Sequence, residues 1–237
     1  MNKFKVLLIL TILLLVLIFI IVVFNNKKIY MNYFPRRTVR GVMNVLRDEI
    51  DPRIINNLSN AGFNGYPNEI TLIVLKDEKE LEVWGKQEGK WVYINKYPIK
   101  AASGVAGPKL VQGDRQVPEG IYNIIALNPN SSYHLSMKIN YPNYFDKKKA
   151  NIDGRTNLGG DIFFHGKDVS IGCIAIGDQA IEELFYLVAK VNKENVRVII
   201  SPYDFRKREV KVHDYRKLEW LDELYCKIDN ELADYIK

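Results

Sequence analysis

The chain has 237 residues, 47% of them apolar, which is enough for one domain with a buried core and excludes a disordered chain. Its net charge of +6 and its pI near 9.1 would suit nucleic acid, an anionic membrane surface or an acidic cell wall. The sequence has no zinc-knuckle spacing, no Gly-rich phosphate loop and no basic helix with interspersed aromatic residues. Nucleic acid is therefore the least supported of these partners.

The first segment, residues 1–28, has the composition of a membrane anchor. Lys3 and Lys5 precede an uncharged run, residues 6–24, in which Thr11 is the only polar side chain. As a helix, a run of this length covers roughly the ~30 Å hydrocarbon layer of a membrane. A cleaved secretory signal is the alternative, but the run is longer than usual for one and no small-residue cleavage site follows. We expect an uncleaved anchor, and positive charge on both sides leaves its orientation open.

Residues 29–67 are predicted to form a spacer. The segment shows little apolar periodicity, and its second half, residues 56–67, is rich in Asn and Gly. One short helix is indicated by a group of apolar residues, Val42, Met43, Val45 and Leu46. An irregular first part of the following domain is an equally open interpretation.

From Ile70 the pattern becomes that of β-strands. Short segments rich in β-branched and aromatic residues alternate with turns of charged residues or Gly, Pro and Asn. We expect strands at 70–75, 81–84, 91–99, 121–127, 133–139 and 196–200. This spacing predicts a mainly β, mostly antiparallel domain with flanking helices (α+β) over residues 68–201.

Two helices are predicted in the last third of the chain. Asp178 can cap the first, because its carboxylate can accept from free N–H groups of the first turn. Apolar residues then share one face, Ile181, Leu184, Phe185, Val188 and Val191. The second helix lies in a charged tail, residues 202–237, and carries an apolar stripe, Leu218, Leu221, Leu224, Ile228 and Leu232. We expect this stripe to pack on its own domain.

The stretch between the strand predicted at 133–139 and the helix predicted to begin at Asp178 contains one of the three histidines and one of the two cysteines. His165, at the end of a short predicted strand, precedes Cys173 by eight residues. An imidazole that takes the proton of a neighbouring thiol makes that thiol a good nucleophile. Gly166 and Gly172 interrupt the loop, and Gly172 would leave N–H groups free for an oxyanion hole. The alternative is a small buried cysteine and a structural histidine.

The same residues resemble a known family. His165-Gly166 followed by Ser170-Ile171-Gly172-Cys173 is similar to the signature of the L,D-transpeptidase (YkuD-like) catalytic domain, whose members act on peptidoglycan stem peptides. Further similar blocks lie in family order at 103–109, 113–114, 117–122, 133–143 and 154–156. The resemblance implies a β-sandwich catalytic domain on the outer side of the bacterial cell membrane, periplasmic or facing the wall. The N-terminus of the anchor would then lie inside the cell.

The resemblance also implies a mechanism. Cys173 would attack the carbonyl of the third stem residue, and His165 would accept the thiol proton and return one to the leaving amine. The imidazole would be oriented by the carbonyl of Gly166, with Asp168 as the second choice. An amine that resolves the resulting thioester gives a cross-link, whereas water gives hydrolysis.

The chain departs from the commonest form of the motif. Many members have His where this chain has Ile171 and Arg where it has Ala175, and the form found here resembles a subgroup with a hydrolase that releases lipoprotein from peptidoglycan. An L,D-amidase or carboxypeptidase is therefore an alternative, and a non-catalytic wall-binding module is another. Arg155 could bind a substrate carboxylate in place of the missing arginine, although it could equally be solvated. Ser170 could position the loop or cap a turn.

The remaining histidines and cysteines receive weaker roles. His134, within the strand predicted at 133–139, could line the cleft or be structural. His213 is expected at the surface. We expect both cysteines to be free thiols, with Cys226 structural. Cys173 and His165 have no further ligands at zinc spacing, so neither a metal nor an organic cofactor is implied. The oligomeric state is not determined by the sequence.

Overall fold

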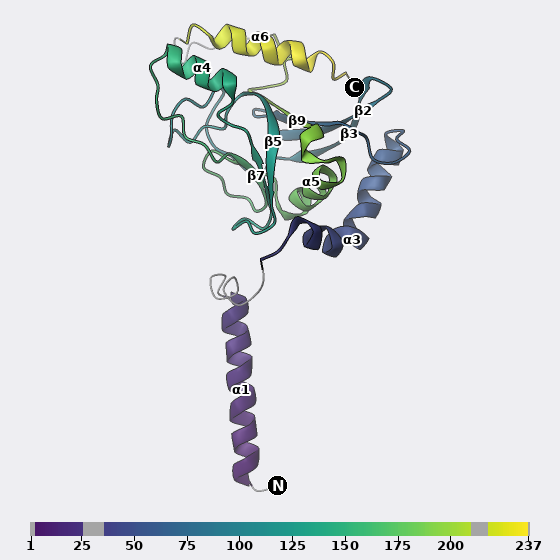
Figure 1. The fold of residues 1–237 in the computed structure, drawn as a ribbon, viewed down its shortest axis with the longest axis vertical. Coiled ribbons are helices and arrows are strands. Elements are labelled where there is room, and N and C mark those ends of the chain that lie inside the picture. Colours follow the sequence, from purple (N-terminus) through teal and green to yellow (C-terminus); the bar gives the residue numbers. More distant parts are fainter. Residues whose placement is uncertain (1–2, 26–35, 210–217, 237) are drawn as a thin grey trace. The chain divides into compact units, whose positions relative to one another are not determined.

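The computed structural model describes residues 3–25, 36–209 and 218–236, which fall into two units, Met1–Thr38 and Val39–Lys237. The first unit contains helix α1 (Lys3–Asn25), drawn in purple in Figure 1. Its described apolar side chains are exposed, and the hydroxyl of Thr11 donates to the Leu7 carbonyl at 2.8 Å. By length and composition α1 can cross a membrane, a property that anchors and signal sequences share.

The second unit is built on a nine-stranded sheet with the order β3-β2-β1-β9-β5-β6-β7-β8-β4. Six of its eight pairings are antiparallel, and only β1–β9 and β7–β8 are parallel among the described residues. The mainly β class with flanking helices is confirmed. The strands are β1 (Ile70–Leu75), β2 (Glu80–Gln87), β3 (Lys90–Pro98), β4 (Ala101–Ala102), β5 (Gly120–Asn128), β6 (Ser136–Ile139), β7 (Phe163–His165), β8 (Ile174–Ala175) and β9 (Val196–Ser201).

Strand β5 joins the two halves of the sheet. Its residues from Gly120 to Asn123 pair with β9, whereas those from Ile124 to Asn128 pair with β6. The register with β6 shifts between Ile124 and Ala126, which is the irregularity that lets a strand bend. The half beyond β5 contains β7 and β8, so it carries both His165 and the segment next to Cys173.

Helices α3 (Val39–Asn60) and α5 (Asp178–Val191) pack together on the main core. The apolar face predicted for α5 is buried throughout, whereas α3 corrects our prediction of a spacer with one short helix. Its buried residues are Val42 and, each one turn apart, Ile50, Ile54 and Leu58, so the buried stripe is one residue wide and the periodicity of the sequence is weak. Residues 29–35 of the predicted spacer lie outside the described residues.

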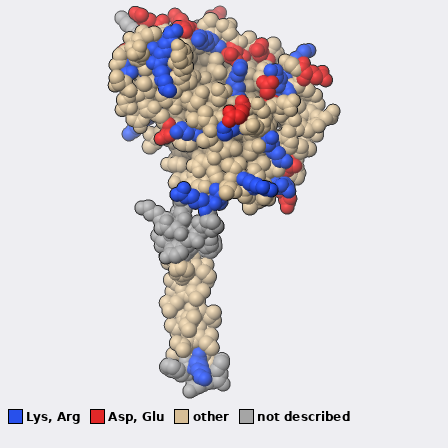
Figure 2. Space-filling view, in the orientation of Figure 1, with Lys and Arg blue, Asp and Glu red and all other residues tan. Residues whose placement is uncertain are grey.

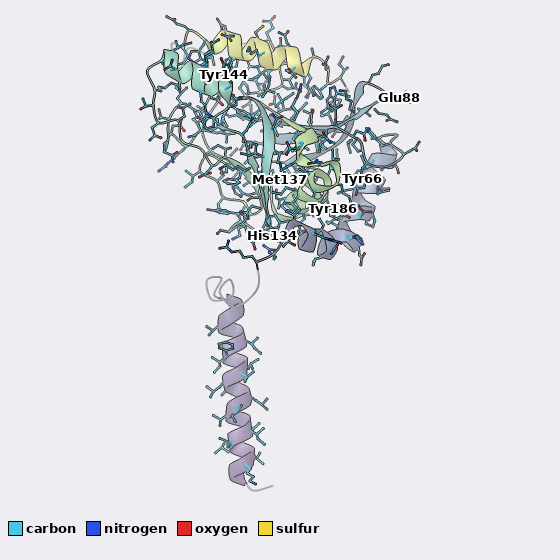
Figure 3. All side chains as sticks on the ribbon, viewed as in Figure 1. Tyr66, Glu88, His134, Met137, Tyr144 and Tyr186 are labelled. Carbon is cyan, nitrogen blue, oxygen red and sulfur yellow. The ribbon has the colours of Figure 1, made fainter. Side chains whose placement is uncertain are left out.

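Asp51 connects α3 to its neighbours. Its Oδ1 accepts hydrogen bonds from the hydroxyls of Tyr66 at 2.7 Å and Tyr186 at 2.8 Å, and both rings are labelled in Figure 3. Lys190 of α5 lies 3.3 Å from the same oxygen. These contacts make the segment from Val39 onward part of the compact unit.

A second core lies under α6 (Leu221–Leu232). Leu221, Leu224, Ile228 and Leu232 are buried there, which confirms that the tail stripe packs on its own domain. Both cysteines are free, as expected, but Cys226 is exposed and our structural interpretation of it was wrong. Cys226 lies two residues from Leu224 and from Ile228, which is about 200° around a helix. Its side chain therefore points away from the buried stripe.

Helix α4 (Tyr144–Ile152) was not predicted. Its run of lysines hides the short apolar face, which buries Ala150 and most of Lys149. A capping box begins the helix: the side chain of Asn143 accepts from the Asp146 N–H, and the Asp146 carboxylate accepts from the Asn143 N–H. The Asn and Asp three residues apart were the available sequence signal.

The excess positive charge does not single out a binding surface on the face that Figure 2 shows. Lys and Arg side chains there are interspersed with Asp and Glu side chains. Among the described residues, basic side chains also form ion pairs, such as Arg208 with Asp77 at 2.8 Å and Arg197 with Glu231 at 2.5 Å. The charge therefore remains weak evidence about the partner.

Candidate active site

His165 is the last residue of β7, and its side chain is buried. Its Nδ1 lies 2.7 Å from the carbonyl oxygen of Gly166. Because a carbonyl can only accept, Nδ1 carries the proton and Nε2 is left as the acceptor. The ring of Tyr133 lies against the imidazole, with 4.6 Å between the centroids. Burial lowers the pKa of His165, against a smaller opposite effect of the hydrogen bond, which favours the neutral imidazole.

Cys173 immediately precedes β8, which runs parallel to β7 with Phe164 opposite Ile174 and His165 opposite Ala175. The thiol donates to the Asp161 carbonyl, with 3.6 Å between sulfur and oxygen. Burial raises the pKa of the Cys173 thiol, and a hydrogen bond from the Phe163 N–H opposes this effect. Burial thus biases both the thiol and the imidazole toward their neutral forms.

Two serines hold the turn that contains Gly172. The hydroxyl of Ser170 donates to the Cys173 carbonyl at 2.5 Å, and the hydroxyl of Ser103 accepts the Gly172 N–H at 2.6 Å. Gly172 has φ +95°, a conformation that side chains disfavour. Ser170 thus positions the loop, one of the two roles left open for it. Ser103 was not found from the sequence, where its only signal was its place in a block that resembles the family.

The expectation that Gly172 leaves N–H groups free for an oxyanion hole needs correction for the N–H of Gly172 itself. The Gly172 N–H is bound by Ser103, and the Gly166 N–H donates to the Tyr133 carbonyl at 3.1 Å. Gly166 contributes its carbonyl to the imidazole instead. It must lack a side chain, because a Cβ there would lie 2.4 Å from Asp178 Oδ1 and 2.8 Å from the Tyr133 oxygen.

Asp178 does not cap α5 as predicted. Gly177 is the N-cap residue, and Asp178 is the first residue of the helix. Its Oδ1 accepts the Lys167 N–H at 2.8 Å, which ties the loop after His165 to the helix. A carboxylate in the first turn is still favoured by the positive end of the helix dipole.

Arg155 is not available for a substrate carboxylate. Its Nε and one terminal nitrogen donate to the same Asp153 carboxylate oxygen at 2.9 and 2.7 Å, and its other terminal nitrogen donates to the Leu110 carbonyl at 2.9 Å. The guanidinium also lies over the Trp220 ring, 5.7 Å from its centroid. These contacts neutralise the charge and direct it into the fold.

His134 lies before β6, which begins at Ser136 and is shorter than predicted. It has φ +74°, and its Nε2 is 2.6 Å from Glu182 Oε1 on α5 (Figure 3). This contact supports a structural role. Asp168 is exposed, and the orienting role weighed for it is filled by the Gly166 carbonyl. His213 lies outside the described residues.

In the curled mixed sheet the buried His165 ends β7, and Cys173 directly precedes the adjacent parallel strand β8. The chain belongs to the L,D-transpeptidase catalytic domain family (YkuD), whose model matches residues 69–200. A curated relative is "Putative L,D-transpeptidase YafK" of Escherichia coli (strain K12), 32% identical over 147 residues that cover 60% of this chain and 57% of YafK.

Similar solved structures include the helical cell shape determining protein Pgp2 from Campylobacter jejuni, with TM-score 0.47, 25% identity, and coverage of 63% of this chain and 55% of Pgp2. Mycobacterium tuberculosis L,D-transpeptidase 1 is more distant, with TM-score 0.33, 12% identity, and coverage of 56% and 62%. The chain thus spans little more than half the length of YafK and Pgp2.

Proposed function

We propose that this chain is a peptidoglycan-remodelling cysteine L,D-transpeptidase that forms a thioester between Cys173 and a stem peptide. The observation that carries the proposal is the hydrogen bond from His165 Nδ1 to the Gly166 carbonyl, 2.7 Å long. It leaves Nε2 of a buried imidazole as a base, and it needs no acidic third residue. Membership of the L,D-transpeptidase catalytic domain family supports the substrate class.

The reaction uses the groups of the site in two halves. In the first, Sγ of Cys173 bonds to the carbonyl carbon of the third stem residue while His165 Nε2 takes the thiol proton. The tetrahedral intermediate then collapses, the bond to the leaving amine breaks, and the imidazolium returns its proton to that amine. In the second half, His165 deprotonates an acceptor amine that attacks the thioester and releases Cys173.

The oxyanion needs a hydrogen-bond donor near the nucleophile. The N–H groups of Gly166 and Gly172 are already bound, to Tyr133 and Ser103. We therefore assign this role to the Cys173 N–H, at the N-terminal end of β8. Removal of one such donor costs roughly 3 kcal/mol of transition-state stabilisation in other enzymes.

Hydrolysis of the same thioester by water is the second candidate. Hydrolysis is supported by two positions at which this chain departs from the common motif, Ile171 and Ala175. Ile171 is 77% exposed and brings no proton-transfer group to the turn, whereas Ala175 is fully buried in β8. Arg155, bound to Asp153, does not replace the missing arginine. None of these three side chains, Ile171, Ala175 and Arg155, would favour an acceptor amine over water.

We place the domain outside the cell, behind α1 as an anchor with its N-terminus inside. Support comes from the length and apolar composition of α1 and from the wall location of the substrate. Alkali or salt extraction of membranes would test this, because an anchored chain stays with the membrane, whereas a chain cleaved after residue 25 is released.

The activity is tested by muropeptide mass spectrometry. The full chain in detergent is incubated with peptidoglycan that contains tetrapeptide stems, beside its Cys173→Ala variant and, as a matched control, Cys226→Ser, which changes the exposed cysteine. New cross-linked dimers made by the parent and by Cys226→Ser alone would support transpeptidation. Shortened or released peptides without dimers would favour hydrolysis. Identical products from all three chains would refute the catalytic proposal for this substrate, and a wall-binding module would then remain.

A further inference from the structure

Ser103 lies opposite the candidate nucleophile. The antiparallel pair β4–β8 places Ala101 opposite Ala175 and Ala102 opposite Ile174. The next pair in this register is Ser103 and Cys173, just beyond the end of the ladder. The Ser103 hydroxyl continues the contact between the strands, since it accepts the N–H of Gly172 at 2.6 Å.

The backbone after Ser103 is held by Gln116. The buried Gln116 side chain accepts the Val105 N–H at 2.9 Å. Between them, Gly104 has φ +93°, and a Cβ at this residue would lie 1.8 Å from Gln116 Oε1. The Gln116 carbonyl is 3.6 Å from the Cβ position of Gly172. Gln116 therefore holds the segment that carries Ser103, and its carbonyl lies near the space that a side chain at Gly172 would occupy.

A buried ion pair fixes the far end of this segment. Lys76 Nζ donates to the Gly107 carbonyl at 3.0 Å, to the Val117 carbonyl at 3.1 Å and to Glu119 at 2.8 Å. Glu119 also accepts the Gly107 N–H at 2.7 Å and the Tyr225 hydroxyl at 2.9 Å. The Lys76 and Glu119 side chains are only 7% and 0% exposed. An acceptor on such a support can hold the Gly172 peptide in one orientation.

The other side of the segment faces a cavity of about 880 Å³. Residues 102–106 form one wall, and Lys76, Lys79, Tyr203 and Arg208 are among the other lining residues. Ser103 lines this cavity and also bonds to Gly172. Threonine keeps the hydroxyl group and is therefore the conservative replacement for Ser103.

We propose that Ser103 is a positioning residue for Cys173, an inference that rests on the proposed function. By accepting the Gly172 N–H it fixes the peptide before Cys173, and with it the direction of the Cys173 N–H and of the thiol. Ser170 holds the other side of the same turn through the Cys173 carbonyl. Loss of the Ser103 hydroxyl leaves the turn free to rotate, so the thiol spends less time aligned with the imidazole.

The test measures alkylation of Cys173 by iodoacetamide, which needs no peptidoglycan. It uses the full chain in detergent with Cys226→Ser, so that Cys173 is the single thiol, and follows the rate by intact mass between pH 5 and 9. The variants are Ser103→Ala, Ser103→Thr and His165→Ala. Ser201→Ala is the control, because it removes another hydroxyl that is hydrogen-bonded to the backbone, to the Tyr203 carbonyl at 2.6 Å.

We expect Ser103→Ala to slow alkylation at pH 7.5 by about tenfold, whereas Ser103→Thr stays within about threefold of the parent and Ser201→Ala within about twofold. Gln116→Met, which keeps the stem but removes the acceptor for Val105, should slow alkylation about threefold. It serves as a second variant should Ser103→Ala not fold, with thermal unfolding as the check.

Two results would contradict the proposals. If Ser103→Ala and Gln116→Met react as fast as the parent while His165→Ala is slow, Ser103 has no positioning role. If His165→Ala reacts as fast as the parent, the proposed catalytic pair fails, and a slow Ser103→Ala would still support the positioning of Cys173.

Discussion

Two clusters of polar side chains in this domain differ in whether their groups are neutral or charged. At the candidate active site, His165 and Cys173 bond to backbone groups, and burial moves the pKa of each toward its neutral form. In the second cluster, Arg206 donates to Asp204 at 2.7 Å and to Glu82 at 2.9 Å. Burial alone would raise the pKa of Asp204, but the hydrogen bond and charge of Arg206 outweigh it, and the pKa is lowered.

The difference matches the role proposed for each cluster. In the proposed mechanism a thiol and an imidazole that are both neutral exchange a proton, and a counter-ion that fixed either charge would oppose this transfer. The Arg206 cluster keeps its charges in place and ties the end of the chain to the sheet, since Arg206 also donates to the Tyr235 carbonyl at 3.0 Å. Variants that remove one group from each cluster should therefore fail in different ways.

Removal of the base is expected to have the largest effect. His165→Ala should lower the rate of thioester formation by about 10²- to 10⁴-fold, because the imidazole supplies general base and acid catalysis. Mass spectrometry of the acyl-enzyme measures this rate, and thermal unfolding checks that the fold persists. A loss below about threefold would contradict the role of His165.

The same experiment on the parent chain gives a pH dependence with a defined sign. The pKa of His165 is lowered from 6.5, so the neutral base persists as the pH falls to 6.5 and is lost only below it. We expect the acid limb of the rate profile to have its midpoint below pH 6.5. A midpoint above 6.5 would indicate an imidazolium held by a negative charge, such as the Cys173 thiolate.

Arg206→Met is expected to act on stability instead. It leaves the buried carboxylates of Glu82 and Asp204 without their main partner, which should lower the free energy of unfolding by about 3 to 5 kcal/mol. Urea unfolding followed by tryptophan fluorescence measures the change. The matched control is Arg208→Met, because Arg208 pairs with Asp77 and Glu78 at the surface, where solvent screens the charges, and its loss should lower the free energy of unfolding much less. Equal losses in the two variants would contradict the contrast.

Asp146 offers an intermediate case, a partly buried carboxylate that is hydrogen-bonded to Asn143 and Tyr122 and feels the charges of Arg155 and Lys147. Burial raises its pKa from 3.8 to about 6, against the opposing hydrogen bonds from Asn143 and Tyr122. The folded state therefore binds this proton more tightly than the unfolded state. Its contribution to stability is complete below pH 3.8 and is lost as the pH rises through about 6.

Asp146→Asn should remove that part of the pH dependence. Between pH 4 and 7 the free energy of unfolding of the parent should fall, relative to the variant, by at most about 3 kcal/mol. Urea unfolding at several pH values measures the difference. Parallel curves for the two chains would contradict the raised pKa.

The smallest effect is expected for His134→Gln. The His134–Glu182 contact is partly exposed, with 31% and 22% of the two side chains accessible, so its loss should cost about 1 kcal/mol or less. Turnover should change less than about threefold, because we assign His134 no contact with the substrate. A large change in KM without a change in stability would instead support the alternative that His134 lines the substrate cleft.

The pattern of residue types along the chain was enough to predict much of the fold. A run of apolar, mostly β-branched residues predicted the strand at 70–75 with its observed bounds, and apolar spacing predicted α5 and α6. The pattern was weakest where few side chains are buried. Helix α4 buries Ala150 and the stem of Lys149, and α3 buries only four of its 22 residues.

The sequence by itself determined the family, the strand-rich class and the candidate pair of His165 and Cys173, because these depend on residue types and spacings along the chain. Only the tertiary structure decided which polar groups near that pair are already occupied. Arg155 is bound by Asp153, and the Gly172 N–H is bound by Ser103, 69 residues earlier in the chain. The physical reason is that hydrogen bonds between distant segments depend on strand register, here that of β4 against β8.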